Sequence, residues 1–134
     1  MVGISTKGIY ALAAMYCLSR SSNAKLMQIK EIAASTQISH GYLEQILSTL
    51  KKSSLVVSIR GVNGGYKLAR NSQEINALEI IESVEGKLFV PNENLGASVV
   101  LDTFWLSMQE KVREAFDVKL SELDKSYQMY FYEI

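Results

Sequence analysis

The chain of 134 residues is long enough for one compact domain, or for one domain with a dimerisation extension. Hydrophobic residues make up 48% of it, so a core can be buried, and no apolar run approaches the length of a bilayer crossing. The formal net charge is zero, which by itself disfavours a nucleic-acid-binding protein.

The charge is unevenly distributed along the chain. Residues 1–70 carry nine Lys and Arg against two acids, a net +7, whereas residues 71–134 carry five against twelve, a net −7. Chance clustering of solvated charge is the weaker interpretation of so large an asymmetry. The pattern predicts a basic face for a polyanion and an acidic remainder turned away from it.

The cysteine content restricts both compartment and cofactors. Cys17 is the single cysteine, so one chain can form neither an intramolecular disulfide nor a cysteine-based metal site. The apolar run 8–18 is a poor secretory leader, because no convincing cleavage site follows it. We therefore expect a cytoplasmic protein.

Residues 5–52 read as three helices. The first is capped by Ser5 or Thr6 and runs to about Ser19; the second spans Gln28 to Ser35. A turn at 36–38 leads to a third helix, N-capped by Ser39 and ending near Lys52. In the first helix, one face at helical spacing holds Ile9, Leu12, Ala13, Tyr16 and Cys17. In the third, the expected buried stripe is Leu43, Ile46, Leu47 and Leu50, and the opposite polar face holds Gly41, Glu44, Gln45, Ser48 and Thr49.

A β-hairpin is predicted directly after the third helix. A strand at 56–59 returns through 66–68, and Asn63-Gly64 is a strong turn signal because both residues tolerate positive φ. Arg60 lies at the shoulder of this hairpin. A helix-turn-helix followed by a basic hairpin is typical of a winged helix on DNA. The predicted fold is mainly α with a small β-hairpin wing.

The remaining sequence predicts a helical extension. Asn76 and Glu79 form a capping pair for a fourth helix that Gly86 ends, and a loop follows at 87–97. A long helix from Ser98 to Phe116 carries a heptad-like apolar seam, which fits ordinary core packing or a dimer contact. The seam comprises Leu101, Trp105, Met108, Val112 and Ala115. Ser121 is expected to cap a last helix, and aromatic residues at 127–132 are expected to pack. The expected units are a winged helix-turn-helix domain at 1–86, the loop, and a dimerisation helix with a C-terminal helix at 98–134.

Four segments together resemble a known family. They read ISTKGIYAL at 4–12, IKEIAASTQISHGYLEQIL at 29–47, LVVSIRGVNGGYKLAR at 55–70 and INALEIIESVEG at 75–86. The sequence strongly resembles the Rrf-two-type winged-helix regulators, which are bacterial transcription factors. The resemblance implies a homodimer on a roughly palindromic double-stranded DNA operator, with the third helix in the major groove and the wing in the minor groove.

The resemblance also assigns DNA contacts. On the recognition helix it implies Ser39, Gly41, Tyr42, Glu44 and Gln45, and on the wing Arg60, Asn63, Gly64 and Gly65. We add His40 as a surface contact, and Lys51 and Lys52, which suit either a phosphate or the helix C-terminus. Gln45 can pair bidentately with adenine, and Arg60 can enter a narrow minor groove. Glu44 can accept from cytosine N4, or repel phosphate and so reject wrong sequences.

One departure from the family matters for cofactors. Cluster-binding members place three cysteines in the region that corresponds to 87–105 here, and this chain has none there. An iron–sulfur cofactor held in that manner is excluded, since such clusters need thiolates. Asp102, at the fourth ligand position, is then a solvated helix residue. For Cys17, burial is favoured over a redox switch.

The leading hypothesis is a sequence-specific, homodimeric transcriptional repressor without a cluster or other cofactor. Its effector is a small molecule or a partner enzyme, or it responds to nothing beyond its own concentration. The alternative is a winged-helix protein-interaction module regulated by a partner protein. An enzyme is rejected, because no nucleophile–base pair and no phosphate-cradling loop is evident.

Overall fold

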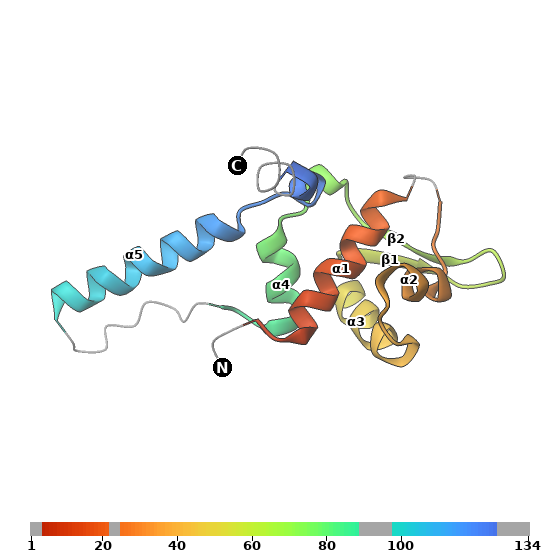
Figure 1. Cartoon of the computed structure of the whole chain (residues 1–134), viewed down its shortest axis with the longest axis horizontal. Helices are drawn as coiled ribbons and strands as arrows, with labels where there is room; N and C mark the ends of the chain where they lie inside the picture. Colours follow the sequence, from red (N-terminus) through yellow and green to blue (C-terminus); the bar gives the residue numbers. More distant parts are fainter. Residues whose placement is uncertain (1–3, 22–24, 89–97, 126–134) are drawn as a thin grey trace.

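The computed structural model describes residues 4–21, 25–88 and 98–125 (Figure 1). Most of the loop predicted at 87–97 and the aromatic cluster at 127–132 therefore lie outside the described residues. The described helices are α1 (Thr6–Arg20), α2 (Ile29–Thr36), α3 (His40–Lys52), α4 (Ala77–Glu85) and α5 (Val99–Phe116). The hairpin consists of β1 (Val56–Ile59) and β2 (Gly65–Leu68), and short 3-10 helices are η1 (Ser72–Glu74) and η2 (Leu120–Glu122).

The core lies where α1, α3 and α4 pack together. All four residues of the predicted stripe on α3 are buried, which confirms the helical pattern read from the sequence. Ile32 of α2 and Leu120 of η2 are also buried against this core. Burial of each such aliphatic side chain stabilises the fold by about 1.5–3 kcal/mol, before conformational entropy is counted. The helix-turn-helix is thus held rigidly on α1.

The apolar stripe predicted on α1 enters this core only in part. The buried residues of α1 are Gly8, Ala11, Ala14, Met15, Cys17 and Leu18, of which only Cys17 belongs to the predicted stripe. Leu12, Ala13 and Tyr16 are half-buried and pack against the core, whereas Ile9 is 59% exposed. The helix is apolar on two sides, so its periodicity alone could not tell which side is covered in one chain.

The hairpin is paired antiparallel from Val56↔Leu68 to Ile59↔Gly65, and Met27 adds a bridge to Tyr66. The prediction of a tight turn centred on Asn63-Gly64 is wrong in its geometry. Neither residue has positive φ; Gly61 (φ 119°) and Gly65 (φ 152°) do. The connection is therefore a longer loop, 60–64, because the last cross-strand pair forms outside it.

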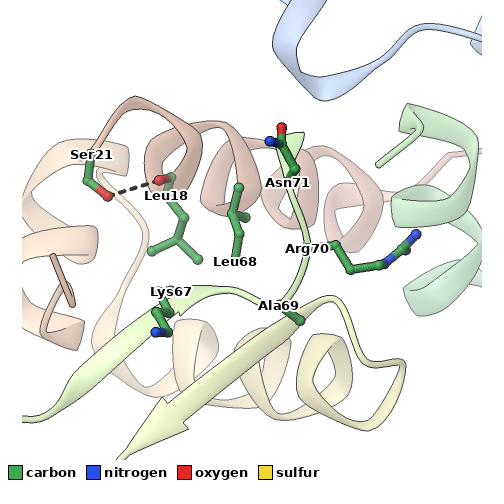
Figure 2. Close-up of a pocket in the computed structure, with 7 residues that line it drawn as sticks. All are labelled: Leu18, Ser21, Lys67, Leu68, Ala69, Arg70 and Asn71. Atoms are coloured by element: carbon green, nitrogen blue, oxygen red, sulfur yellow. Dashed lines mark hydrogen bonds between the residues drawn. The ribbon is translucent and has the colours of Figure 1, made fainter. Parts of the chain in front are cut away.

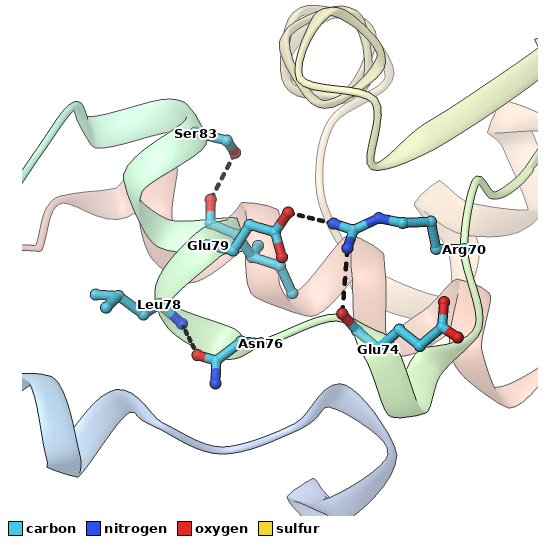
Figure 3. Close-up of polar contacts among 7 residues, drawn as sticks. Arg70, Glu74, Asn76, Leu78, Glu79 and Ser83 are labelled. Atoms are coloured by element: carbon cyan, nitrogen blue, oxygen red, sulfur yellow. Dashed lines mark hydrogen bonds and ion pairs between the residues drawn. The ribbon is translucent and has the colours of Figure 1, made fainter.

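The start of α4 shows how one residue of the predicted capping pair is used differently (Figure 3). The Asn76 side chain accepts a hydrogen bond from the backbone N–H of Leu78 at 2.9 Å, as expected of an N-cap. Glu79 instead forms an ion pair with Arg70, whose guanidinium also donates to the carbonyl of Glu74. Gly86 ends the helix with φ 86°, as predicted.

The long helix α5 extends away from the rest of the molecule, at the end opposite the hairpin (Figure 1). None of the residues of α5 is buried, and most of its large apolar side chains are exposed to solvent. Across the described ranges, no helix is both long and hydrophobic enough to cross a membrane.

The segment after α5 returns to the domain. The backbone N–H of Ala77 donates to the carbonyl of Val118, and that of Leu120 donates to the carbonyl of Ile75, both at 2.8 Å. Lys119, not the predicted Ser121, is the N-cap of η2, and Ser121 lies inside it. Because Leu120 is buried, the C-terminal end of α5 is fixed to α4 and η1.

Candidate nucleic-acid interface

The outer face of α3 is the main surface on which the predicted DNA contacts gather. Gly41, Glu44, Gln45 and Ser48 are all exposed there, on the side opposite the buried stripe. Ser39 is the N-cap by backbone geometry, although its side chain makes no capping bond. An exposed polar face on a rigidly packed helix can enter a major groove and hydrogen-bond base edges.

Two residues of α3, Tyr42 and Glu44, make side-chain contacts at the edge of this face. Tyr42 is half-buried and packs edge-on against Tyr10 of α1, with ring centroids 5.5 Å apart. His40 lies one turn before Glu44, with Nε2 3.9 Å from Oε1. The geometry thus makes Tyr42 a support of α3, and places Glu44 beside a potential cation at the N-terminal end of the helix.

A residue that sequence reasoning missed lies next to Gln45. Lys7, at the start of α1, lines a hollow of about 130 Å³ between α1 and α3 together with Tyr42, Gln45 and Thr49. The lysine is exposed. Only the packing of α1 on α3 brings these positions together. The only indication in the sequence that Lys7 belongs to the site was the excess of basic residues in the first half of the chain.

The wing presents Arg60, Val62 and Asn63 to solvent, whereas two of its glycines face the protein itself. A Cβ added at Gly64 would lie 2.0 Å from the carbonyl oxygen of Ile59. At Gly65 it would lie 2.5 Å from the carbonyl oxygen of Met27, on a backbone with positive φ. These two positions shape the wing, and Arg60 and Asn63 are its side chains available for DNA.

Not all of the basic residues in the first half are available to a polyanion. Arg70 pairs with Glu79, and Arg20 donates to Asp124 at 2.9 Å. A cleft of about 270 Å³ lies between α1 and β2. In Figure 2, the side chains of Lys67 and Arg70, which line this cleft, point apart and do not converge. The remaining cations are exposed: Lys7, Lys25, Lys30, Lys51, Lys52 and Arg60.

A second surface, on the other side of α1, is apolar. A groove of about 750 Å³ is lined by the stripe of α1 and by parts of α4, α5 and the segment after η2. Its lining residues are Ile4, Ile9, Leu12, Ala13, Tyr16, Ile81, Phe116, Leu123 and Asp124. Phe116, the last residue of α5, lines this groove and lies one helical turn after the exposed Val112. The groove and the exposed apolar side of α5 therefore meet at Phe116 and are together called the α1–α5 surface.

The N-terminus of α1 is held by a carboxylate from α4. Glu85 Oε1 accepts from the backbone N–H groups of Ser5 and Gly8, both at 2.9 Å, and from the Ser5 hydroxyl. The Ser5 hydroxyl bond and these backbone bonds lower the pKa of Glu85. This contact joins the end of α4, from which the chain leaves the winged helix, to the helix that supports α3.

The donor set of this chain does not fit a thiolate-bound metal cluster. Cys17 is the single cysteine of the 134 residues, and it is buried with its Sγ 3.9 Å from Met27 Sδ. Within the described ranges, no three His, Cys, Asp or Glu residues come together as metal ligands. Asp102 lies on α5 without such companions, which leaves no thiolate set for iron.

With this geometry in view, the comparisons with known proteins decide the family. A family profile described as "Rrf2: Iron-dependent Transcriptional regulator" matches residues 4–125. The chain belongs to the Rrf2 family. This confirms the resemblance found in the sequence motifs, and with it a DNA-binding transcriptional regulator of the winged-helix fold. The single cysteine leaves one chain without the thiolates that an iron–sulfur cluster needs.

Among Rrf2 relatives, the IscR regulator of Cereibacter sphaeroides is 39% identical over 71% of this chain and 63% of its own length. The CymR regulator of Bacillus subtilis is 34% identical over 92% of this chain and 90% of its own length. The solved structure of CymR, described as the global cysteine regulator of B. subtilis, has a TM-score of 0.83 at 33% identity. It covers 94% of this chain and 98% of that one. The chain thus spans under two thirds of the IscR relative but nearly all of CymR.

Proposed function

We propose that this Rrf2 protein is a cytoplasmic, homodimeric repressor that reads a roughly palindromic DNA operator, without an iron–sulfur cluster and without enzymatic activity. The observation that carries the proposal is the exposed polar face of α3 next to a wing that presents Arg60. Both lie in the half of the chain with a net charge of +7.

Each part of this face has a distinct task on DNA. Gln45 and Glu44 read base edges in the major groove, while Arg60 enters the adjacent minor groove. Lys51 and Lys52, at the C-terminal end of α3, and Lys7 bind phosphates and so fix the register of the helix. The acidic second half faces away from the duplex and does not compete with it.

The homodimer follows from the α1–α5 surface. Leu101, Trp105 and Val112 are 49%, 58% and 40% exposed, which is unusual for a helix with a continuous apolar side. The groove beside α1 is apolar and continuous with the same helix. A second copy related by a two-fold axis would place its own α5 seam on this surface, and each copy covers the other. Met108 lies in the same seam, and its burial is intermediate already in one chain.

The signal that the repressor senses is a small molecule or a partner enzyme, since the chain has no thiolate set for a cluster. The wing and the basic surface favour this regulator over a winged-helix module that only binds proteins. A protein adaptor has no need of an exposed arginine on a wing together with five exposed lysines in the first half of the chain.

Selection from a random duplex library, followed by affinity measurements across a salt series, tests the proposal. We expect two half-sites about one helical turn apart and an affinity that falls steeply with salt. Arg60→Ala should weaken specific binding about 5- to 150-fold, which corresponds to 1–3 kcal/mol. Lys111→Ala, an exposed cation on α5, is the matched control and should bind normally. No enriched sequence, or equal effects of both variants, would contradict the proposal.

A further inference from the structure

The position of the wing relative to the helix-turn-helix is set by the segment just before α2. Met27 and Tyr66 exchange two backbone hydrogen bonds, at 2.9 and 2.8 Å, which tie the part of β2 next to the loop 60–64 to this segment. The absence of a Cβ at Gly65 allows the Met27 carbonyl to approach so closely. This end of the wing is therefore fixed by backbone hydrogen bonds to Met27, and the Tyr66 side chain also packs against the core.

The wing loop itself is held by a side chain. Gln28 Nε2 donates to the carbonyl of Val62 at 3.1 Å, although Val62 is 90% exposed at the outer end of the loop. Within the loop, the backbone N–H of Gly64 donates to the carbonyl of Gly61 at 3.0 Å. The bond from Gln28 thus connects the part of the hairpin that carries Arg60 to a residue outside the hairpin.

The backbone of Gln28 is anchored to the first turn of α2. Gln28 is the N-cap of α2. Its carbonyl accepts hydrogen bonds from the backbone N–H groups of Glu31, at 2.9 Å, and Ile32, at 3.1 Å. The backbone N–H of Gln28 donates to Glu31 Oε1 at 3.2 Å. Because Ile32 is buried in the core, this turn cannot move separately from the helix-turn-helix. One residue therefore connects the rigid helical unit with the wing loop.

We infer that Gln28 is a positioning residue for DNA recognition: it holds the wing loop in register with α2 and α3, so that Arg60 meets the minor groove while α3 lies in the major groove. The inference rests on the proposed function. It extends that function to a residue that contacts the wing and not the recognition helix. The physical basis is preorganisation, because a loop ordered before binding loses less conformational entropy on the duplex.

Two variants remove the bond in different ways. Gln28→Met keeps the length of the side chain but lacks the donor, and Gln28→Ser keeps a good N-cap but is too short to reach Val62. Gln73→Met makes the same chemical change at an exposed position of η1 and is the matched control. Agreement between the two Gln28 variants separates the lost wing contact from any effect on the cap of α2.

The first readout is the backbone order of residues 61–63 in the protein without DNA, from 15N relaxation. The second is affinity for the selected operator, with each variant combined with Arg60→Ala in a double-mutant cycle. We expect lower order parameters in both Gln28 variants and an affinity loss of about 2- to 10-fold, as for a neutral hydrogen bond. That loss should vanish when Arg60 is already alanine, and Gln73→Met should change neither readout.

Two results would overturn the inference: unchanged order of the wing in both Gln28 variants, or an equal loss of affinity with and without Arg60. A wild-type protein that binds no duplex would refute the proposed function instead. In that case the relaxation data still decide whether Gln28 holds the wing, so the two failures are distinguishable.

Discussion

Replacing Trp105 by alanine tests whether the apolar side of α5 is a dimer interface. The side chain lies on α5 beside Phe104, with ring centroids 5.0 Å apart, and the residue is 58% exposed in one chain. A tryptophan has about 250 Å² of surface, so roughly 145 Å² of it is available to a second copy. Since alanine would still bury part of this area, truncation removes about 100 Å² of apolar contact per subunit.

At about 25 cal/mol per Å², this loss corresponds to about 2.5 kcal/mol for each subunit, and a two-fold axis places the substitution in the interface twice. Because not every square ångström is covered, we expect the dimer to weaken by about 2–5 kcal/mol. The dissociation constant should then rise about 30-fold to several thousand-fold.

Sedimentation equilibrium across a dilution series measures this constant directly. Glu110→Ala is the control, because Glu110 is exposed on the side of α5 opposite the seam, and its substitution should leave the dimer intact. Operator affinity should fall only at concentrations where the Trp105→Ala dimer dissociates. A Trp105→Ala protein that remains dimeric at nanomolar concentration, with normal operator affinity, would refute the assignment of the seam.

Three further predictions concern the wing, the α1 cap and the core. Gly65→Ala should lower stability by about 1–3 kcal/mol and weaken operator binding. The added Cβ would lie 2.5 Å from the Met27 carbonyl oxygen, on a backbone with positive φ. Urea unfolding measures the stability, and fluorescence anisotropy measures the binding. Glu85→Gln should flatten the acid limb of the stability profile. Because the pKa of Glu85 is lower in the folded than in the unfolded protein, its ionised carboxylate stabilises the fold above the unfolded-state pKa. This stability is lost as the pH falls through the folded-state pKa. Parallel stability profiles for the wild-type and Glu85→Gln proteins would contradict this. Leu47→Ala should lower the free energy of unfolding by about 2–5 kcal/mol, because Leu47 is completely buried, whereas exposed Ser48→Ala should change it by less than about 0.5 kcal/mol.

The amino-acid sequence by itself determined the helix-turn-helix, the hairpin and the family. The stripe of α3 was predicted correctly, because a helix covered on one side leaves a clear 3.6-residue period. The strands were predicted to within a residue, since β-branched residues and glycines mark them. Motifs that combine these elements then identified the Rrf2 family before any fold was known.

Where a residue could contact more than one part of the chain, only the tertiary structure decided which contact forms. Periodicity marked one apolar side of α1, yet only Cys17 of that side is buried, and its other residues line the groove beside α5. Glu79 had a local capping role available, but its carboxylate pairs with Arg70 instead. The wing turn follows the approach of Met27 to Gly65, and the contact from Gln28 to Val62 spans 34 residues. Sequence patterns record local preference, whereas these outcomes depend on which distant groups the packed core brings together.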